Sequence, residues 1–313
     1  MNAWWELMST ALSSPLLQRS LLTALVVGVS APVVGTYLVQ RRLSLLGDGV
    51  GHVALTGVAM GWLVGARTHA EPNDAYAVLG AVVAAVIGAI LIDVVSARGR
   101  TSGDVALALL FYGGIAGGVV LIGVAGGTNA NLMGYLFGSL ATVSPSELVT
   151  TMVGAAVILV VGLGGRTVLF AVSQDEEFAR SAGLPVRVVN LAIAVVAALT
   201  VTIAMRVVGL LLVSALMIVP VAIAQQLTSS FRRTMTLAMG LGALLCVGGL
   251  LITFTQPLAP GATIVVLAVT VYAGVAIVRT VVRPRRRHQH ADPHPDVPDD
   301  VSLSEQEVGQ CNA

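Results

Sequence analysis

The chain has 313 residues, of which 56% are hydrophobic and only 11% are charged, and its mean hydropathy is +0.90. An ordinary soluble domain carries about 25% charged residues, so water is not the main solvent of this chain. The formal net charge of only +1 gives no electrostatic indication of a nucleic-acid partner. We therefore predict an all-α integral membrane protein, a polytopic bundle of transmembrane helices.

Apolar stretches recur along the chain at lengths close to the roughly 20 residues that a membrane-spanning helix needs. We predict about nine spans, near residues 18–39, 45–65, 75–95, 104–125, 146–163, 188–204, 208–227, 234–255 and 262–280. The sixth and seventh spans are separated only by Met205 to Val207, so we expect a short or broken helix around Arg206.

The arginines predict the orientation, because short loops that carry positive residues are retained on the cytoplasmic side. The loops after spans one, three, five and seven hold Arg41, Arg42, Arg98, Arg100, Arg166, Arg180, Arg187, Arg232 and Arg233. The opposite loops hold only Arg67 and Arg206. With an odd number of spans, this asymmetry predicts an outside N-terminus and a cytoplasmic C-terminus.

The end of the chain changes in composition to arginine, proline, aspartate and histidine. Such a segment cannot bury enough apolar surface to fold alone. We predict one transmembrane domain over residues 1–282 and a disordered cytoplasmic tail over residues 283–313. Its histidines could bind a divalent ion loosely, or the tail could simply be solvated beside a membrane-surface arginine cluster.

The hydropathy pattern places one ionisable pair, Asp48 and His52, inside the membrane. Charged side chains are costly there, so an ionisable residue in a membrane helix is a candidate functional residue. Their spacing of four residues puts both on one face of a helix. If that helix begins near Leu43, a rise of about 1.5 Å per residue places Asp48 about 7 Å and His52 about 13 Å into it.

A carboxylate oxygen with an imidazole nitrogen suits a divalent metal such as zinc or manganese. The alternative is an Asp–His hydrogen bond that only holds helices together. The surrounding glycines, at positions 47, 49, 51 and 57, would let neighbouring helices approach closely. Asp93, Asp104 and Glu147 lie near predicted span ends, where we expect them to contact water or cap a helix.

The stretch from Ser173 to Arg187 predicts a short helix between two spans. Ser173 and Glu176 have the spacing of a capping box, and Gly183 followed by Pro185 is a helix stop signal. Its mixed apolar and charged face suits either docking to a soluble partner or lying on the membrane surface.

The chain contains no lysine and therefore no P-loop motif. It also has no His-Glu-x-x-His motif of a metalloprotease. We therefore predict that it is not an enzyme, and that any ATP hydrolysis that drives it occurs on a partner chain.

Four blocks of the sequence resemble the bacterial ABC-3 family, the permease subunits of zinc and manganese importers. They are Arg41 to Asp48 followed by His52, Tyr135 to Ser139, Asp175 to Pro185, and Val208 to Pro220, and the resemblance covers about residues 16–280. Where the family often has Pro-Gly, this sequence has Thr56-Gly57.

The resemblance implies a permease in the bacterial inner or plasma membrane that carries zinc or manganese inward and binds no permanent cofactor. It implies a homodimer, cytoplasmic ABC ATPase subunits and an extracellular metal-binding solute-binding protein. It assigns the metal path to Asp48 and His52 and coupling to the ATPase to the following residues: Asp175, Glu176, Phe178, Ala179, Gly183 and Pro185. A permease for a metal chelate or cobalamin, or a stand-alone secondary transporter, remains an alternative.

Overall fold

The structure of the protein is a computed structural model that describes residues 14–68, 74–97, 103–124, 129–138, 140, 143–256 and 258–282. The chain divides into two units, residues 1–276 and residues 277–313. The predicted tail over residues 283–313 lies outside the described residues, as do His69 and Glu71 of a predicted loop. The described residues contain helices and no strand.

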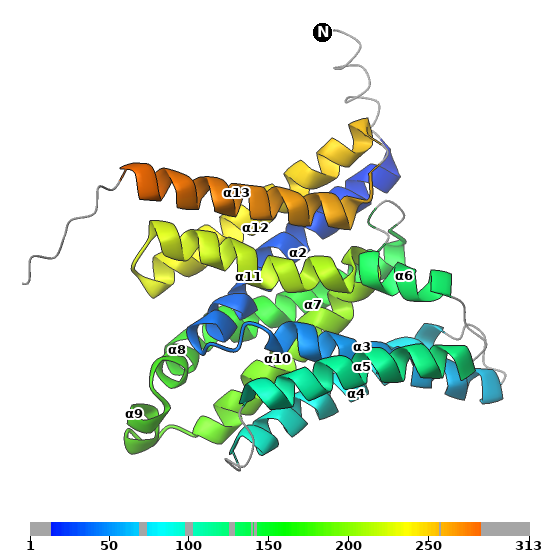
Figure 1. Ribbon diagram of the computed structural model, residues 1–313, viewed down its shortest axis with the longest axis horizontal. Helices are drawn as coiled ribbons and strands as arrows, with labels where there is room; N and C mark the ends of the chain where they lie inside the picture. The colour runs from blue at the N-terminus through cyan, green and yellow to red at the C-terminus, as the bar shows by residue number, and fades with distance from the viewer. Residues whose placement is uncertain are drawn as a thin grey trace, which may run out of the picture. The chain divides into compact units, whose positions relative to one another are not determined.

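The helices alternate with short connections, as expected for a polytopic bundle (Figure 1). They are α2 (Pro15–Gln40), α3 (Leu46–Thr68), α4 (Asp74–Ala97), α5 (Gly103–Val124), α6 (Asn129–Phe137), α7 (Pro145–Gly164), α8 (Arg166–Gln174), α9 (Glu176–Ser181), α10 (Val186–Val208), α11 (Leu210–Leu227), α12 (Phe231–Thr255) and α13 (Pro260–Val282).

Seven of the described helices are long and apolar enough to cross a membrane: α2, α5, α7, α10, α11, α12 and α13. The other two predicted spans coincide with α3 and α4, which are not among the seven. The all-α membrane fold is therefore confirmed, whereas the predicted count of about nine spans is not. The Asp48–His52 pair and the many glycines lower the mean hydropathy of α3, so this helix is not among the seven.

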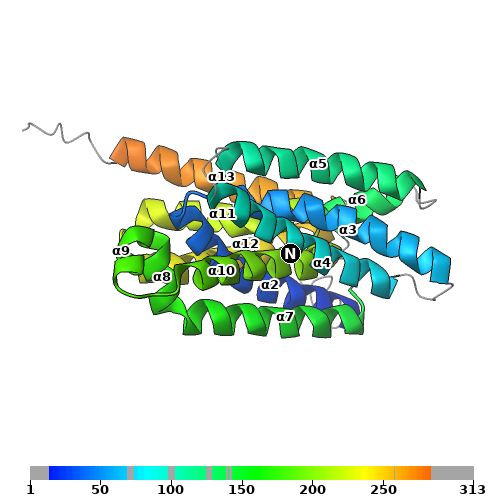
Figure 2. The same ribbon diagram turned by 90° about the horizontal axis from the view of Figure 1, so that it is seen from below.

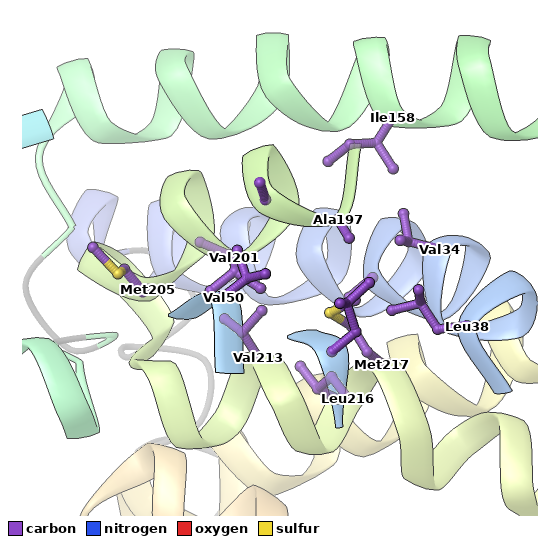
Figure 3. Packing of buried hydrophobic residues seen from close by; sticks show 14 of the residues in the cluster. Val34, Leu38, Val50, Ile158, Ala197, Val201, Met205, Val213, Leu216 and Met217 are labelled. Carbon is purple, nitrogen blue, oxygen red and sulfur yellow. The ribbon is translucent and has the colours of Figure 1, made fainter. Parts of the chain in front are cut away.

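Two groups of helices pack closely within residues 1–276. Helices α3, α4 and α5 lie side by side in both views, and α2 packs against α7, α11 and α12 (Figures 1 and 2). Helix α10 contacts members of both groups. Figure 3 shows the buried core that results, in which Val50 of α3, Val201 of α10 and Val213 of α11 converge. The first half of α3 is thus enclosed by apolar side chains.

The break between the sixth and seventh predicted spans lies at Gly209 and not around Arg206. Helix α10 continues through Arg206 to Val208, and Gly209 alone separates it from α11, with φ at +90°. Glycine is favoured there because a side chain at positive φ is strained, and because a Cβ would overlap the backbone of Phe137 and Gly138 at the end of α6. Backbone contact therefore sets the position of the break.

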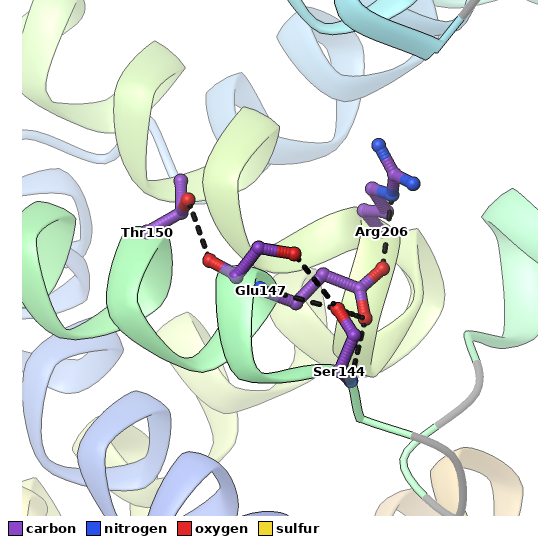
Figure 4. A network of polar contacts seen from close by, with 5 residues as sticks. Ser144, Glu147, Thr150 and Arg206 are labelled. Carbon is purple, nitrogen blue, oxygen red and sulfur yellow. Dashed lines mark hydrogen bonds and ion pairs between the residues drawn. The ribbon is translucent and has the colours of Figure 1, made fainter. Parts of the chain in front are cut away.

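Arg206 instead pairs with a helix start (Figure 4). Ser144 and Glu147 form a capping box at the beginning of α7, with Pro145 in the first turn. The Nε of Arg206 also donates to Glu147 Oε1 at 3.0 Å, which ties the end of α10 to the start of α7. The expectation that Glu147 caps a helix is confirmed.

Glycines bring α3 and α4 into backbone contact. A Cβ on Gly57 would overlap the carbonyl of Gly80, and a Cβ on Gly80 would overlap the carbonyl of Gly57. Gly51 is similarly confined by the side chains of Leu210 and Val201. Small residues at helix crossings allow this approach in membranes, where van der Waals packing drives association.

We expect Gly57→Ala to lower the stability of the bundle by about 1–3 kcal/mol, because the added methyl group forces α3 away from α4. The measurement is the melting temperature of the purified protein in detergent. Gly113→Ala is the matched control, because a Cβ there meets no atom within 4 Å. Equal melting temperatures for the two variants would contradict this account of the crossing.

Candidate metal site

Asp48 and His52 lie in the first two turns of α3. The helix begins at Leu46 rather than near Leu43, because the end of α2 and the turn that follows it use residues up to 45. The rise of about 1.5 Å per residue therefore places Asp48 about 3 Å and His52 about 9 Å from the helix start, both shallower than predicted. Negative charge in the first turn also interacts favourably with the positive end of the helix dipole.

The two side chains face each other across a short gap. His52 Nε2 lies 3.8 Å from Asp48 Oδ1, and the exposed fractions of the side chains are 7% for His52 and 23% for Asp48. This distance is too long for a hydrogen bond. Two ligand bonds of about 2.0–2.2 Å to one ion would span such a gap. The pair is therefore not the simple Asp–His hydrogen bond of the alternative reading.

A third polar group comes from a different helix. Ser214 of α11 is 8% exposed, and its hydroxyl donates to Asp48 Oδ1 at 3.1 Å. Ser214 is not among the residues predicted from the sequence. A signal was present, however, because Ser214 is the only polar side chain in the block from Val208 to Pro220. The site thus joins α3 to the helix that follows the Gly209 break.

Helix α5 covers the imidazole. The rings of His52 and Phe111 meet edge to face with centroids 4.5 Å apart. Thr56 donates to the carbonyl of Gly114 at 2.7 Å, and Gly114 is so close to the His52 backbone that a Cβ would collide with it. The Nδ1 of His52 is buried and has no hydrogen-bond partner within the described structure. These contacts hold the imidazole ring in place and leave its Nδ1 without a hydrogen bond.

A carboxylate and an imidazole, with a neighbouring hydroxyl that orients the carboxylate, suit a divalent ion of intermediate hardness. Over the described ranges, no group of three or more His, Cys, Asp or Glu side chains is placed to hold a metal ion. Within these ranges, Asp48 and His52 supply two ligands, fewer than the about four of a typical structural zinc site.

The predicted helix between residues 173 and 187 is shorter than expected. Ser173 belongs to α8, and α9 covers only Glu176–Ser181, so the predicted Ser173–Glu176 capping box is wrong. Asp175 is the N-cap, and its Oδ1 accepts from the Phe178 amide at 2.9 Å. An aspartate directly before the helix is better placed to cap it than a serine two residues earlier.

The proposed coupling residues point in different directions. Glu176 accepts hydrogen bonds from Arg41 and Asn190, and Ala179 is fully buried. Phe178, in contrast, is 67% exposed. Helices α8 and α9 lie at the end of the bundle where α2 ends and α10 begins (Figures 1 and 2). The two remaining residues follow α9: Gly183 has φ at +79°, and Pro185 directly precedes α10.

A membrane helix bundle that holds a buried imidazole beside a partly buried carboxylate is typical of membrane transport proteins. Comparison with known proteins makes the class specific. The family model of the ABC 3 transport family matches residues 13–279, and the chain belongs to this family. It is therefore a multi-pass membrane protein of a transport family.

Individual relatives match most of the chain. The manganese transport system membrane protein MntC of Halalkalibacterium halodurans is 33% identical over 263 residues, which are 84% of this chain and 87% of the relative. The chelated iron transport system membrane protein YfeD of Yersinia pestis is 30% identical over 284 residues, covering 91% and 92%. The solved structure of PsaBC from Streptococcus pneumoniae in complex with a Fab is 30% identical, with a TM-score of 0.76, and covers 92% of this chain and 98% of that one.

We expect Asp175→Ala to loosen α9, because the loss of an N-cap costs about 1 kcal/mol of helix stability. Hydrogen exchange of the α9 amides, followed by mass spectrometry, should become about fivefold faster. Glu177→Ala is the control. It also removes a carboxylate from this end of α9, but within the described residues Glu177 does not cap the helix. Unchanged exchange in Asp175→Ala would contradict the assignment of the cap.

Proposed function

We propose that this chain is the membrane permease subunit of an ABC importer that carries divalent transition-metal ions, manganese in the first place, into the cytoplasm. The observation that carries the proposal is the meeting of Asp48, His52 and Ser214 inside a chain of the ABC 3 transport family. Ionisable side chains within transmembrane segments are rare and usually line a substrate or ion path, which supports a transport role for this pair.

The ligand types support a transition-metal ion as the substrate. Oxygen from Asp48 with nitrogen from His52 suits manganese and zinc alike. The name of the MntC relative refers to manganese, which favours that ion over zinc. The name of YfeD refers to chelated iron, so iron is the competitor to measure. Membership in an ABC family argues against a stand-alone secondary transporter.

The proposed transport cycle uses separate partners for delivery and for energy. An extracellular solute-binding protein would release the metal to a homodimer of permeases, in which each copy adds ligands to an incomplete site. Two cytoplasmic ABC ATPase subunits would then drive the change from outward to inward access. In this cycle the N-terminus is outside and the C-terminus is cytoplasmic, as the arginine distribution predicts.

Coupling to the ATPase is proposed for α9. Phe178 is the large apolar side chain that this helix exposes, while Glu176 and Ala179 fasten the helix to the bundle. A buried aromatic anchor in a partner's pocket commonly carries much of the binding energy of an interface. Motion of the ATPases would therefore be passed to α2 and α10 through the contacts of Glu176.

We expect the double variant Asp48→Ala, His52→Ala to abolish manganese uptake while the complex still assembles, because both proposed protein ligands are lost. Ser214→Ala should retain transport at a reduced rate, because it removes only the hydrogen bond that orients Asp48. The measurement is manganese uptake into cells or proteoliposomes that contain the whole transporter, with iron and zinc as competitors.

Ser30→Ala is the matched control for Ser214→Ala. Ser30 is also buried, but its hydroxyl bonds only to its own helix, at the carbonyl of Val27. Full manganese uptake by the double variant would reject the proposed site. Uptake of chelated iron in place of the free ion would reject the proposed substrate.

We expect Phe178→Asp to weaken binding of the ATPase subunit at least tenfold, because a charge replaces the apolar anchor. Co-purification of the ATPase with the permease measures this effect. Leu227→Asp is the control, because Leu227 is 54% exposed at the end of a different helix, α11. Retention of the ATPase by Phe178→Asp would exclude α9 as the main contact.

A further inference from the structure

The carboxylate of Glu176 joins α9 to two long helices through one oxygen atom. Arg41, directly after α2, donates from Nη2 to Glu176 Oε1 at 2.5 Å. Asn190, near the start of α10, donates from Nδ2 to the same atom at 3.0 Å. The Arg41 side chain is 13% exposed and that of Glu176 is 41% exposed, so the arginine end of the pair is largely shielded from solvent. Because Glu176 is the first residue of α9, a shift of this helix acts directly on both donors.

Polar side chains, rather than close packing, connect α9 to the end of α2. The backbone of α9 packs against α8 and α10, its neighbours in the chain. A cavity of about 630 Å³ lies beside it, and Arg41, Glu176 and Asn190 all belong to the cavity lining. Gln40 donates to Gln174 Oε1, which adds a polar contact between the end of α2 and α8. The position of α9 relative to α2 is therefore set by a few polar contacts at the edge of a cavity.

The chain between Arg41 and Asp48 has little freedom to absorb a shift. Helix α2 ends in a Schellman motif, in which the Leu43 amide donates to Leu38 O at 2.8 Å. The Leu46 amide then donates to Leu43 O at 3.0 Å, and Leu46 is the first residue of α3. Leu46 is also only 3% exposed. We therefore expect the end of α2 and the first turn of α3 to move together.

The second donor leads to the same site by another route. Asn190 belongs to α10, and Val201 of that helix packs so closely on Gly51 of α3 that an added Cβ would lie 2.9 Å from Val201 Cγ1. The helix that follows α10 carries Ser214, which donates to Asp48. Both hydrogen bonds to the α9 carboxylate thus come from parts of the chain that lead to the candidate metal site.

We propose that Arg41 is a positioning residue that couples α9 to the candidate metal site. This inference rests on the proposed function. A shift of α9 that follows the ATPases would pull on Arg41 through Glu176, and the hydrogen-bonded turn would pass the shift to the start of α3. Asp48 would then move relative to Ser214 on α11, so the metal is held in one state of the transporter and released in the other.

The physical basis is that hydrogen bonds and ion pairs between rigid elements carry energetic coupling between distant sites. Without the Arg41–Glu176 pair, α9 would still bind the ATPase through Phe178, because that side chain points away from the pair and is exposed. ATP would still be hydrolysed, but each hydrolysis would move less metal. This loss of coupling separates a positioning role from a role in folding, which would lower hydrolysis and transport together.

The test is the number of manganese ions transported per ATP hydrolysed, measured in proteoliposomes that contain the whole transporter. Arg41→Gln and Glu176→Gln should each lower this ratio about fivefold, while the ATPase still co-purifies with the permease. Arg42→Gln and Glu177→Gln are the matched controls. Each removes an exposed charge of the same sign at the next position in the chain, outside the ion pair, and each should keep the ratio.

A double-mutant cycle shows whether the two residues act through each other. The double variant Arg41→Gln, Glu176→Gln should lower the ratio no further than either single variant, because one contact is lost in all three. Arg41→Lys, which keeps the charge, should recover the ratio to within about twofold.

Three results would overturn the proposal: an unchanged ratio in Arg41→Gln, additive losses in the double variant, or hydrolysis and transport that fall in equal proportion. An equal loss in Arg42→Gln would also overturn it, since the effect would then follow charge and not the pair. Failure of the unchanged transporter to move manganese would instead contradict the proposed function.

Discussion

A carboxylate and an imidazole enclosed by apolar helices are the constraint around which the middle of this molecule is organised. Asp48 sits at the positive end of a helix dipole and accepts a hydrogen bond from Ser214 of α11. The His52 ring rests against Phe111 of α5. The hydrogen bond from Ser214 lowers the cost of keeping the Asp48 carboxylate partly out of water, whereas Phe111 packs against the His52 ring and confines it. Helices α5 and α11 must therefore approach α3 closely.

That close approach depends on glycine. Gly114 brings α5 against the backbone of His52, and Gly57 does the same between α3 and α4. Gly209 ends α10 so that α11 begins within reach of α3, and Ser214 lies one turn further along. Larger residues at these positions would separate the helices, and the polar groups would then lose the neighbours that hold them in place.

A second set of polar contacts fastens α9, the proposed coupling helix. Glu176 accepts from Arg41 at the end of α2 and from Asn190 of α10, so the short helix α9 is held at its first residue by two long helices. Because these bonds fix the first residue of the six-residue helix α9, the helix exposes Phe178 in a defined direction.

The sequence alone determined that the protein is an all-α membrane bundle, and it located each long helix to within a few residues, because apolar length and breakers such as proline are local properties. It also identified Asp48 and His52, because their spacing puts them on one helix face whatever surrounds them. It misplaced the break at Arg206 and the cap at Ser173, since both depend on what the neighbouring chain offers.

Only the tertiary structure decided that Ser214 and Phe111 join the pair, and that Glu176 bonds to Arg41 and Asn190 while Phe178 is exposed. These relations connect residues up to 166 positions apart in the chain. Hydropathy and residue spacing describe one helix at a time. The candidate metal site forms where different helices pack against each other, so its full set of neighbours depends on the tertiary structure.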